Sequence, residues 1–232
     1  MSWRDRTLSP AVSTIAYRIR RSSRARRVRV TVDPAHGVEV VLPARAPERA
    51  ADAAVIELRP WIERRVAEIE RLREQIAARG DTVPYLGSQL RLVPQAGRTR
   101  VGWRPELDEL LVPLDAAERR AALERWYRRR ARVEVTARLD AAGAAAGLHY
   151  RGLTVRAQKT RWASCSREGA MSFNWRLLLA PEPVLDYVVW HEVCHLKVMD
   201  HSPRFWALVA RWCPGYREQV RWLRRHGATL VL

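Results

Sequence analysis

The residues best suited to chemistry lie near the C-terminal end, in the run His191-Glu192-Val193-Cys194-His195. Side chains four residues apart on an α-helix share one face, so the imidazoles of His191 and His195 can bind a single metal ion, for which zinc is the natural candidate. Glu192 is rotated by about 100° from His191 around the helix, which places it beside a water on the metal rather than among the ligands. The run therefore predicts a metal-dependent hydrolase with Glu192 as its general base.

A catalytic zinc takes three protein ligands and keeps one position open, so a third ligand is needed near this helix. His201 is the best candidate. We expect the helix to run from Pro181 to about Lys197 and the chain to turn back at Asp200. Ser202 and Pro203 then suit the cap and the first position of the next helix, and the turn between the two helices brings His201 toward the pair.

Four other residues near the motif are weaker candidates. If His201 is not the third ligand, Asp200 and Glu218 are the next to consider. Arg161 and Asn174 have polar side chains that would suit oxyanion donors or substrate orienters if they face the site, although ordinary structural hydrogen bonds account for them equally well.

The composition is that of a soluble globular protein of 232 residues, long enough to bury a core without disulfides. No apolar run approaches the ~18 to 20 residues of a membrane span, and the arginine-rich residues 1–27 have no apolar segment typical of a signal peptide. The three cysteines, Cys165, Cys194 and Cys213, form no paired framework and fit reduced thiols. We therefore expect a cytoplasmic protein with no membrane partner.

The net charge is +17, and almost all of the positive charge is arginine, because only Lys159 and Lys197 are lysines. Such a balance attracts polyanions, so nucleic acid, nucleotides and acidic proteins are candidate partners. The basic stretch Arg20 to Arg27 would lie at a hairpin end or a sheet edge, where it either protects the edge or contacts a polyanion. No nucleic-acid reader motif accompanies the charge, and charges spread over many helices are usually solvated, so this role stays open.

The first half of the chain has the patterns of strands and of one long helical segment. Between Ala11 and Pro43 apolar residues alternate with polar ones, which predicts two or three antiparallel strands. Apolar steps of three and four residues from 47 to 79 predict an amphipathic helix on the sheet, kinked or restarted at Pro60. Residues 82–93 and 101–112 then predict one strand pair.

The second half begins with a long helix. Asp115 with Glu118 forms a plausible capping box, and the arginine-rich helix that follows is expected to end near Ala142, where Gly143 and Gly147 break the pattern.

Two strands are expected after this helix, at residues 153–159 and 171–179, with a turn between them. The second strand directly precedes the metal-binding helix and is a candidate edge strand, whose free backbone groups would pair with an extended peptide. Helices over residues 202–212 and 216–226 complete the chain.

We predict an α+β fold in two parts. Residues 1–113 form an antiparallel, β-rich N-terminal part that includes the helix at 47–79, and residues 114–232 form a helical part with the metal site. No repeat or low-complexity linker separates the parts, so they are expected to form one compact unit.

Five motifs of this chain belong together: Gln158–Ser166 (QKTRWASCS), Asn174–Leu177 (NWRL), His191–His195, His201–Pro203 and Phe205–Trp206. With these motifs the chain resembles the YgjP-like metallopeptidase domain, a bacterial family related to the SprT-like and WLM zinc proteases. Ala163 stands where the family usually has glycine, and Val193 where leucine is common; both changes are small and apolar and cast little doubt on the site.

The resemblance implies a zincin-like core in which His191, His195 and His201 bind zinc and Glu192 is the catalytic residue. Hydrolysis of a protein or peptide substrate is the matching reaction, and the relatives make DNA-associated proteolysis conceivable. Two other functions stay open. One is a metal-dependent nucleoside triphosphate pyrophosphatase or phosphohydrolase, although such enzymes usually hold magnesium with carboxylates; the other is a non-enzymatic nucleic-acid-binding module whose structural zinc is closed by four protein ligands.

Overall fold

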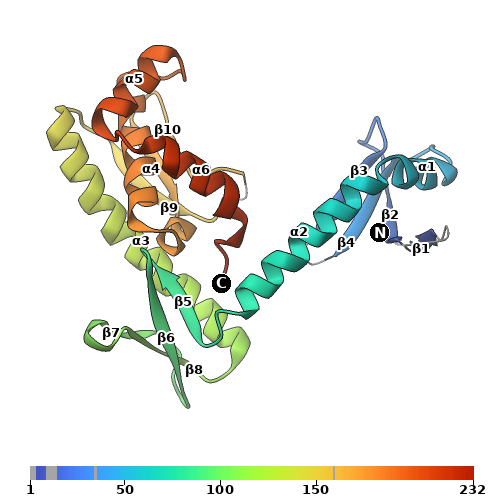
Figure 1. The fold of residues 1–232 in the computed structure, drawn as a ribbon, viewed down its shortest axis with the longest axis horizontal. Helices are drawn as coiled ribbons and strands as arrows, with labels where there is room; N and C mark the ends of the chain where they lie inside the picture. Colours follow the sequence, from blue (N-terminus) through green and yellow to red (C-terminus); the bar gives the residue numbers. More distant parts are fainter. Residues whose placement is uncertain (1–3, 9–14, 34–35, 159) are drawn as a thin grey trace. The chain divides into compact units, whose positions relative to one another are not determined.

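The computed structural model describes residues 4–8, 15–33, 36–158 and 160–232 and shows a mixed α+β fold with several small sheets (Figure 1). It divides into two compact units, Met1–Gln75 and Ile76–Leu232. The sequence pattern predicted the boundary between the two parts at 113/114. The strands of residues 82–113 share a hydrophobic core with the helices that follow them, however, and therefore belong to the second unit. No helix in the described part of the chain is long and apolar enough to cross a bilayer.

The first unit contains a four-stranded sheet in the order β1-β2-β4-β3. The expectation of purely antiparallel strands is wrong: β1 pairs antiparallel with β2, and β3 with β4, but β4 lies between β2 and β3 and runs parallel to β2. Residues 23–28 carry the chain past β4, and alternation along each strand does not reveal which strands become neighbours. The strands are β1 (Arg4–Leu8), β2 (Ile15–Ser22), β3 (Arg29–Asp33) and β4 (Gly37–Pro43).

Two helices bury the apolar face of this sheet. The helices α1 (Arg49–Glu57) and α2 (Arg59–Ala77) are separated at Leu58, so Pro60 lies in the first turn of α2, where its missing N–H removes no helical hydrogen bond. The prediction that the apolar stripe continues across Pro60 is confirmed, because both helices contribute to one core. Val55 and Ile62 are buried there with seven strand residues: Ile15, Tyr17, Ile19, Val30, Val38, Val40 and Leu42.

The second unit begins with a four-stranded sheet in the order β5-β6-β8-β7. The prediction of a single strand pair is wrong, because turns divide both expected strands. Leu86 and Gly87 have φ of 49° and 98°, and Asp108 has φ of 49°, and backbone in this left-handed region ends a strand. The strands are β5 (Thr82–Tyr85), β6 (Ser88–Gln95), β7 (Gly102–Arg104) and β8 (Glu109–Pro113).

The long helix α3 (Ala116–Ala146) starts as the sequence predicts, since the Asp115 side chain accepts a 2.8 Å hydrogen bond from the backbone N–H of Glu118. It continues through Gly143 and ends at Gly147, which has the left-handed φ of 66°. Gly143 serves a different purpose: a Cβ there would lie 2.7 Å from the carbonyl oxygen of Leu148, so only glycine allows the next segment to approach the helix.

A three-stranded sheet follows, in the order β10-β11-β9. Its strands are β9 (Gly152–Arg156), β10 (Ala163–Cys165) and β11 (Ala170–Asn174), and the predicted strand at 171–179 stops at Asn174 and continues as the 3₁₀ helix η2 (Trp175–Leu179). The prediction that this strand is an edge strand is wrong, because β11 lies between β9 and β10 and both of its sides are paired. The chain ends with α4 (Glu182–His195), α5 (Pro203–Trp212) and α6 (Tyr216–His226).

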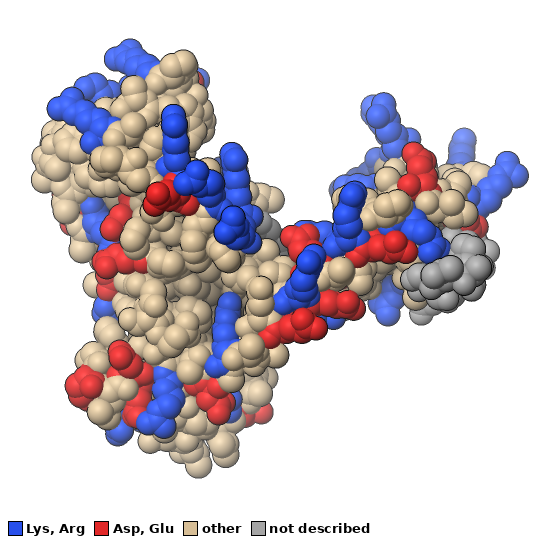
Figure 2. All heavy atoms as spheres, in the orientation of Figure 1, with Lys and Arg blue, Asp and Glu red and all other residues tan. Residues whose placement is uncertain are grey.

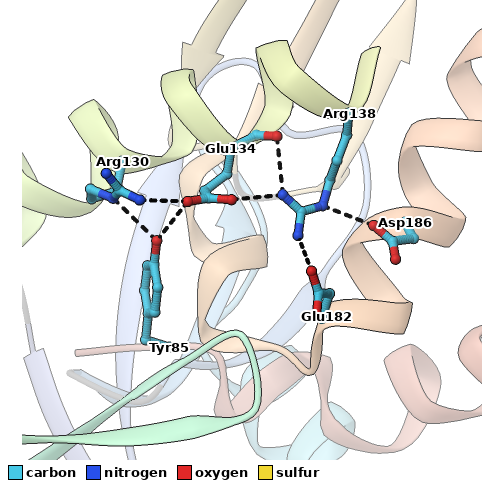
Figure 3. Close-up of polar contacts among 6 residues, drawn as sticks. All are labelled: Tyr85, Arg130, Glu134, Arg138, Glu182 and Asp186. Atoms are coloured by element: carbon cyan, nitrogen blue, oxygen red, sulfur yellow. Dashed lines mark hydrogen bonds and ion pairs between the residues drawn. The ribbon is translucent and has the colours of Figure 1, made fainter. Parts of the chain in front are cut away.

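A network of charges joins α3 to the start of α4 (Figure 3). Arg138 on α3 donates to Glu134 on its own helix at 2.7 Å and to Asp186 on α4 at 2.8 Å. It also contacts Glu182 in the first turn of α4, and Glu134 in turn accepts hydrogen bonds from Tyr85 and Arg130. These contacts fix the N-terminal end of the helix whose other end carries the histidines.

Candidate metal centre

The helix α4 (Glu182–His195) positions the motif. Pro183 lies in its first turn, and apolar residues cover most of its circumference, so the helix is buried on nearly all sides and packs against α3, α5, α6 and β10. It ends at His195, about two residues earlier than the sequence suggested, and the N–H of Val198 donates to the carbonyl of Cys194 at 3.0 Å. This early end starts the turn toward His201.

The ring nitrogens of three histidines converge at the end of this helix. The Nε2 atom of His191 lies 3.2 Å from Nε2 of His195 and 3.1 Å from Nε2 of His201. Zinc–nitrogen bonds of about 2.0–2.1 Å in a tetrahedral site separate two ligand nitrogens by about 3.3–3.4 Å. The spacing of the imidazoles therefore fits three ligands of one ion, and each ring directs its Nε2 atom toward the place where the three nitrogens converge.

The turn after α4 brings His201 to the pair. Asp200 accepts a 3.0 Å hydrogen bond from the N–H of Ser202, which closes the turn, and Ser202 occupies the cap position of α5 as predicted. The first turn of α5 then places the buried ring of Phe205 against the histidines, with its centroid 4.4 Å from that of His195 and 4.9 Å from that of His201. Phe205 thus forms an apolar floor that limits how far the imidazoles can move.

Two hydrogen bonds orient the helical imidazoles from behind. The Nδ1 atom of His195 lies 3.0 Å from the carbonyl oxygen of Val198, and Nδ1 of His191 lies 3.3 Å from the hydroxyl of Tyr187. A carbonyl can only accept, so Nδ1 of His195 holds the proton and Nε2 keeps its lone pair free. Nε2 of His195 is therefore in the form that binds a metal.

The electrostatic environment keeps these histidines neutral. Burial, with smaller contributions from the neighbouring His195 and His201, lowers the pKa of His191 to about 3. Burial also lowers the pKa of His195, against the hydrogen bond to Val198, which raises it. Metal ligation requires neutral imidazole, so His191 and His195 are already in the required protonation state at neutral pH.

Glu192 is buried next to the histidines, with 4% of its surface exposed. Burial raises the pKa of its carboxyl to about 8, and the charge of Arg161 and a backbone hydrogen bond at Cys165 offset this only in part. Its Oε2 atom is fully buried and has no hydrogen-bond partner among the described residues. A buried carboxylate with an unpartnered oxygen is costly unless another group, such as a water, completes it.

Comparison with known families agrees with this geometry. The family model of the YgjP-like metallopeptidase domain matches residues 26–226. The chain belongs to the YgjP-like metallopeptidase family. No curated protein matches it. Among solved structures, the metallopeptidase zymogen abylysin of Pyrococcus abyssi is 26% identical; the match covers 39% of this chain and 93% of that one, with a TM-score of 0.36.

The weaker site candidates of this YgjP-like metallopeptidase lie in different environments. Asn174 is buried, and its amide donates to the carbonyl of Gln158 at 2.8 Å while its oxygen accepts from the N–H of Arg176 at 3.1 Å. The sequence analysis gave structural hydrogen bonds of this kind as the alternative to a role of Asn174 as an oxyanion donor or substrate orienter. Arg161 is exposed, yet close enough to Glu192 for its charge to lower the pKa of that carboxyl. A role in substrate binding stays a prediction for both residues.

The edge strand beside α4 of this metallopeptidase is β10, not β11. Residues Ala163–Cys165 pair with β11 on one side only, and β10 packs against α4. The strand is too short for its alternation to be recognised in the sequence, and residues 161–169 were expected to form a turn. Among the described residues no strand pairs with the other side of β10, and the backbone of Cys165 in this strand forms a hydrogen bond that lowers the pKa of Glu192.

Sequence reasoning missed two groups that support the histidines: the Tyr187 hydroxyl and the Val198 carbonyl. A signal existed for Tyr187, which precedes His191 by four residues and so lies on the same face of the helix. The Val198 carbonyl had no signal, because a backbone group is identified by its position in a turn and not by residue type.

Proposed function

We propose that the chain is a zinc-dependent peptidase with a zincin-like core, in which His191, His195 and His201 hold the metal and Glu192 is the general base. The observation that supports it most strongly is the convergence of three Nε2 atoms. Glu192, the residue after His191, adds a buried carboxyl oxygen that has no hydrogen-bond partner among the described residues. Three imidazoles with one position open are the donor set of a catalytic zinc.

A zinc ion held by these histidines would polarise the substrate carbonyl and lower the pKa of a water in the open position. Glu192 would accept the proton of the attacking water on its carboxylate and would later deliver it to the leaving amine. Burial raises the pKa of Glu192 to about 8 in the metal-free site, so its carboxylate is a stronger base than that of an ordinary glutamate. A zinc ion held nearby would lower this pKa and favour the carboxylate form that accepts a proton.

The substrate in this proposal is an extended peptide. The unpaired side of β10 offers backbone donors and acceptors to a peptide strand next to Glu192. Arg161 lies near enough to stabilise negative charge that develops on the carbonyl oxygen.

The two other functions have less support. Among the described residues, the group that could hold a metal contains three histidines and no fourth His, Cys, Asp or Glu, whereas a structural zinc takes four protein ligands. The group also contains no carboxylate ligand of the kind that magnesium-dependent phosphohydrolases use.

The test uses the purified full chain with its metal content measured, assayed on an unfolded protein, on peptides and on nucleoside triphosphates. Glu192→Gln should keep the zinc and lose peptide hydrolysis, whereas the matched variant Glu106→Gln, at an exposed glutamate between β7 and β8, should behave like the unchanged protein. His201→Ala should lower zinc content strongly. Undiminished hydrolysis by Glu192→Gln would end the general-base proposal, and unchanged zinc in His201→Ala would exclude that ligand.

A further inference from the structure

The most concentrated positive charge of the chain lies in the first unit, in and between β2 and β3. The α3 helix is also rich in arginine, but Glu118, Glu124, Glu134 and Asp140 are interspersed there, and Figure 2 shows acidic and basic side chains next to one another along α2. By contrast, residues 18–29 contain no acidic residue and seven arginines: Arg18, Arg20, Arg21, Arg24, Arg26, Arg27 and Arg29.

The sheet register shows where these arginines lie. Arg20 of β2, Val41 of β4 and Arg29 of β3 pair with one another across the three strands. The neighbouring row of Ile19, Val40 and Val30 belongs to the core, so the row of Arg20 and Arg29 faces the opposite side of the sheet.

On that opposite side the connection between β2 and β3 encloses a pocket of about 460 Å³. Val41 lies at this pocket and is only 3% exposed although it is not on the core side. The pocket is lined by five arginines, Ser22 and small apolar residues, and none of the lining residues is acidic. This connection therefore forms a concave, cationic surface rather than a loose loop.

Most of these arginines are free to bind a ligand. Arg20 pairs with Glu39, and Arg21 donates to the carbonyls of Ala44 and Ala46 at 3.0 and 2.8 Å. The side chains of the other four arginines that line the pocket are exposed and make no hydrogen bond or ion pair with any residue that the structure describes: Arg24, Arg26, Arg27 and Arg29. Four unpaired guanidinium groups around one pocket repel each other, and an anion would relieve this repulsion.

We propose that this arginine pocket of the first unit binds the sugar-phosphate backbone of a nucleic acid. Guanidinium groups form paired hydrogen bonds with phosphate oxygens, and a serine hydroxyl such as that of Ser22 is a further common phosphate donor. A phosphodiester chain is narrow enough to enter a concave pocket and presents several anionic groups in succession, which matches several adjacent arginines.

Two other polyanions fit the pocket less well. A membrane surface is flat, and proteins that bind it usually insert large apolar side chains, whereas the apolar lining here is Ala25, Val28 and the buried Val41. An acidic peptide has carboxylates, which guanidinium also binds, but the pocket has no lining amide or aromatic group to recognise a peptide backbone or ring. The nucleic-acid proposal goes beyond the peptidase proposal and does not depend on it.

The experiment measures binding of the full chain to fluorescent 20-nucleotide single-stranded RNA, single-stranded DNA and duplex DNA by anisotropy, at several salt concentrations. The test variant changes Arg24, Arg26, Arg27 and Arg29 to Gln. Four phosphate contacts contribute a slope of about 3 to the dependence of log affinity on log salt for a single strand. Between 50 and 200 mM salt, the unchanged protein should therefore lose about 50-fold more affinity than the variant loses.

The matched control removes the same charge from exposed arginines of the second unit, by changing Arg120, Arg129, Arg221 and Arg225 to Gln. It should keep most of the salt slope, and changing the four pocket arginines to Lys should also keep it, because the charge remains. Circular dichroism of each variant verifies that it is folded. Glu192→Gln should bind nucleic acid like the unchanged protein, which separates this proposal from the peptidase proposal.

Several results would overturn the proposal. Equal loss of slope in the pocket variant and in the control would show that only the overall charge matters. An unchanged slope in the folded pocket variant would exclude the pocket. Binding of phosphatidylserine vesicles or polyglutamate that needs the pocket, together with nucleic-acid binding that does not, would assign the pocket to that other anion. The three probes decide whether RNA, single-stranded DNA or duplex is preferred.

Discussion

The metal-free protein should lose stability as the pH rises through the pKa of Glu192. Burial raises the pKa of this carboxyl from 4.5 to about 8, so between these values the folded protein holds a proton that the unfolded chain has released. The associated stability is fully present below pH 4.5 and is lost as the pH rises to 8. A difference of about 3.5 pH units corresponds to about 5 kcal/mol, and Glu192 is too buried for solvent to screen much of it.

The assay is urea unfolding of chelator-treated protein between pH 5 and pH 8.5, followed by tryptophan fluorescence. All tryptophans except Trp3 and Trp61 lie in the second unit, so the signal reports the unit that contains Glu192. The Glu192→Gln variant is the reference, because glutamine has no proton to lose. As the pH rises, the free energy of unfolding of the unchanged protein should fall several kcal/mol below that of this variant.

The titration of the histidines does not account for the expected difference between the two proteins. Burial lowers the pKa values of His191 and His195, so their effect is a loss of stability as the pH falls below about 6.5. That effect has the opposite sign and is present in both proteins. Stability curves of the two proteins that run parallel from pH 5 to 8.5 would refute the reasoning, because the carboxyl would then ionise in the folded state as it does in water.

Three further predictions concern the supports of the site. Tyr187→Phe removes the hydroxyl next to Nδ1 of His191 and should weaken zinc binding by about 10- to 100-fold, as measured by competition with a chelating dye; unchanged affinity would show that the hydroxyl does not orient the ring. Gly143→Ala should destabilise the protein by about 1–3 kcal/mol in urea unfolding, since the new Cβ meets a carbonyl at 2.7 Å, whereas Gly152→Ala, with open space around its Cβ, should have little effect. Arg138→Gln should lower the free energy of unfolding in urea by about 1–2 kcal/mol, and by less at high salt. An unchanged free energy of unfolding would show that the charge network with α4 does not stabilise the fold.

Local chemistry made some elements predictable. The start of α3 follows from the side chain of Asp115 and the restart at Pro60 from the missing N–H of proline, because both effects depend on a few adjacent residues. The order of strands was not predictable in the same way. The alternation in β2 is the same whether its neighbour is β3 or β4, and the choice is made by contacts between residues distant in the sequence.

The same distinction applies to the site. The spacing of His191 and His195 on one helix is a local property, and the structure brings them together as expected, with His201 beside them. The position of β10 as the edge strand is a property of the sheet: its three residues carry no pattern, and only the pairing of β11 on both sides excludes the strand that the sequence favoured. Substrate-binding elements are therefore harder to find in a sequence than metal ligands.

The placement of Glu192 is itself an argument for chemistry at this helix. Most of α4 is apolar and well packed, and an apolar residue at position 192 would fit that core without an unpartnered oxygen. The surrounding structure nevertheless holds the carboxyl there, on the helix that packs against the edge strand β10. Local rules of folding are usually broken where function requires it. The predicted decrease in the free energy of unfolding of the metal-free protein at high pH measures the cost of keeping this carboxyl in the core. If the decrease is absent in Glu192→Gln, this single carboxyl is responsible for it.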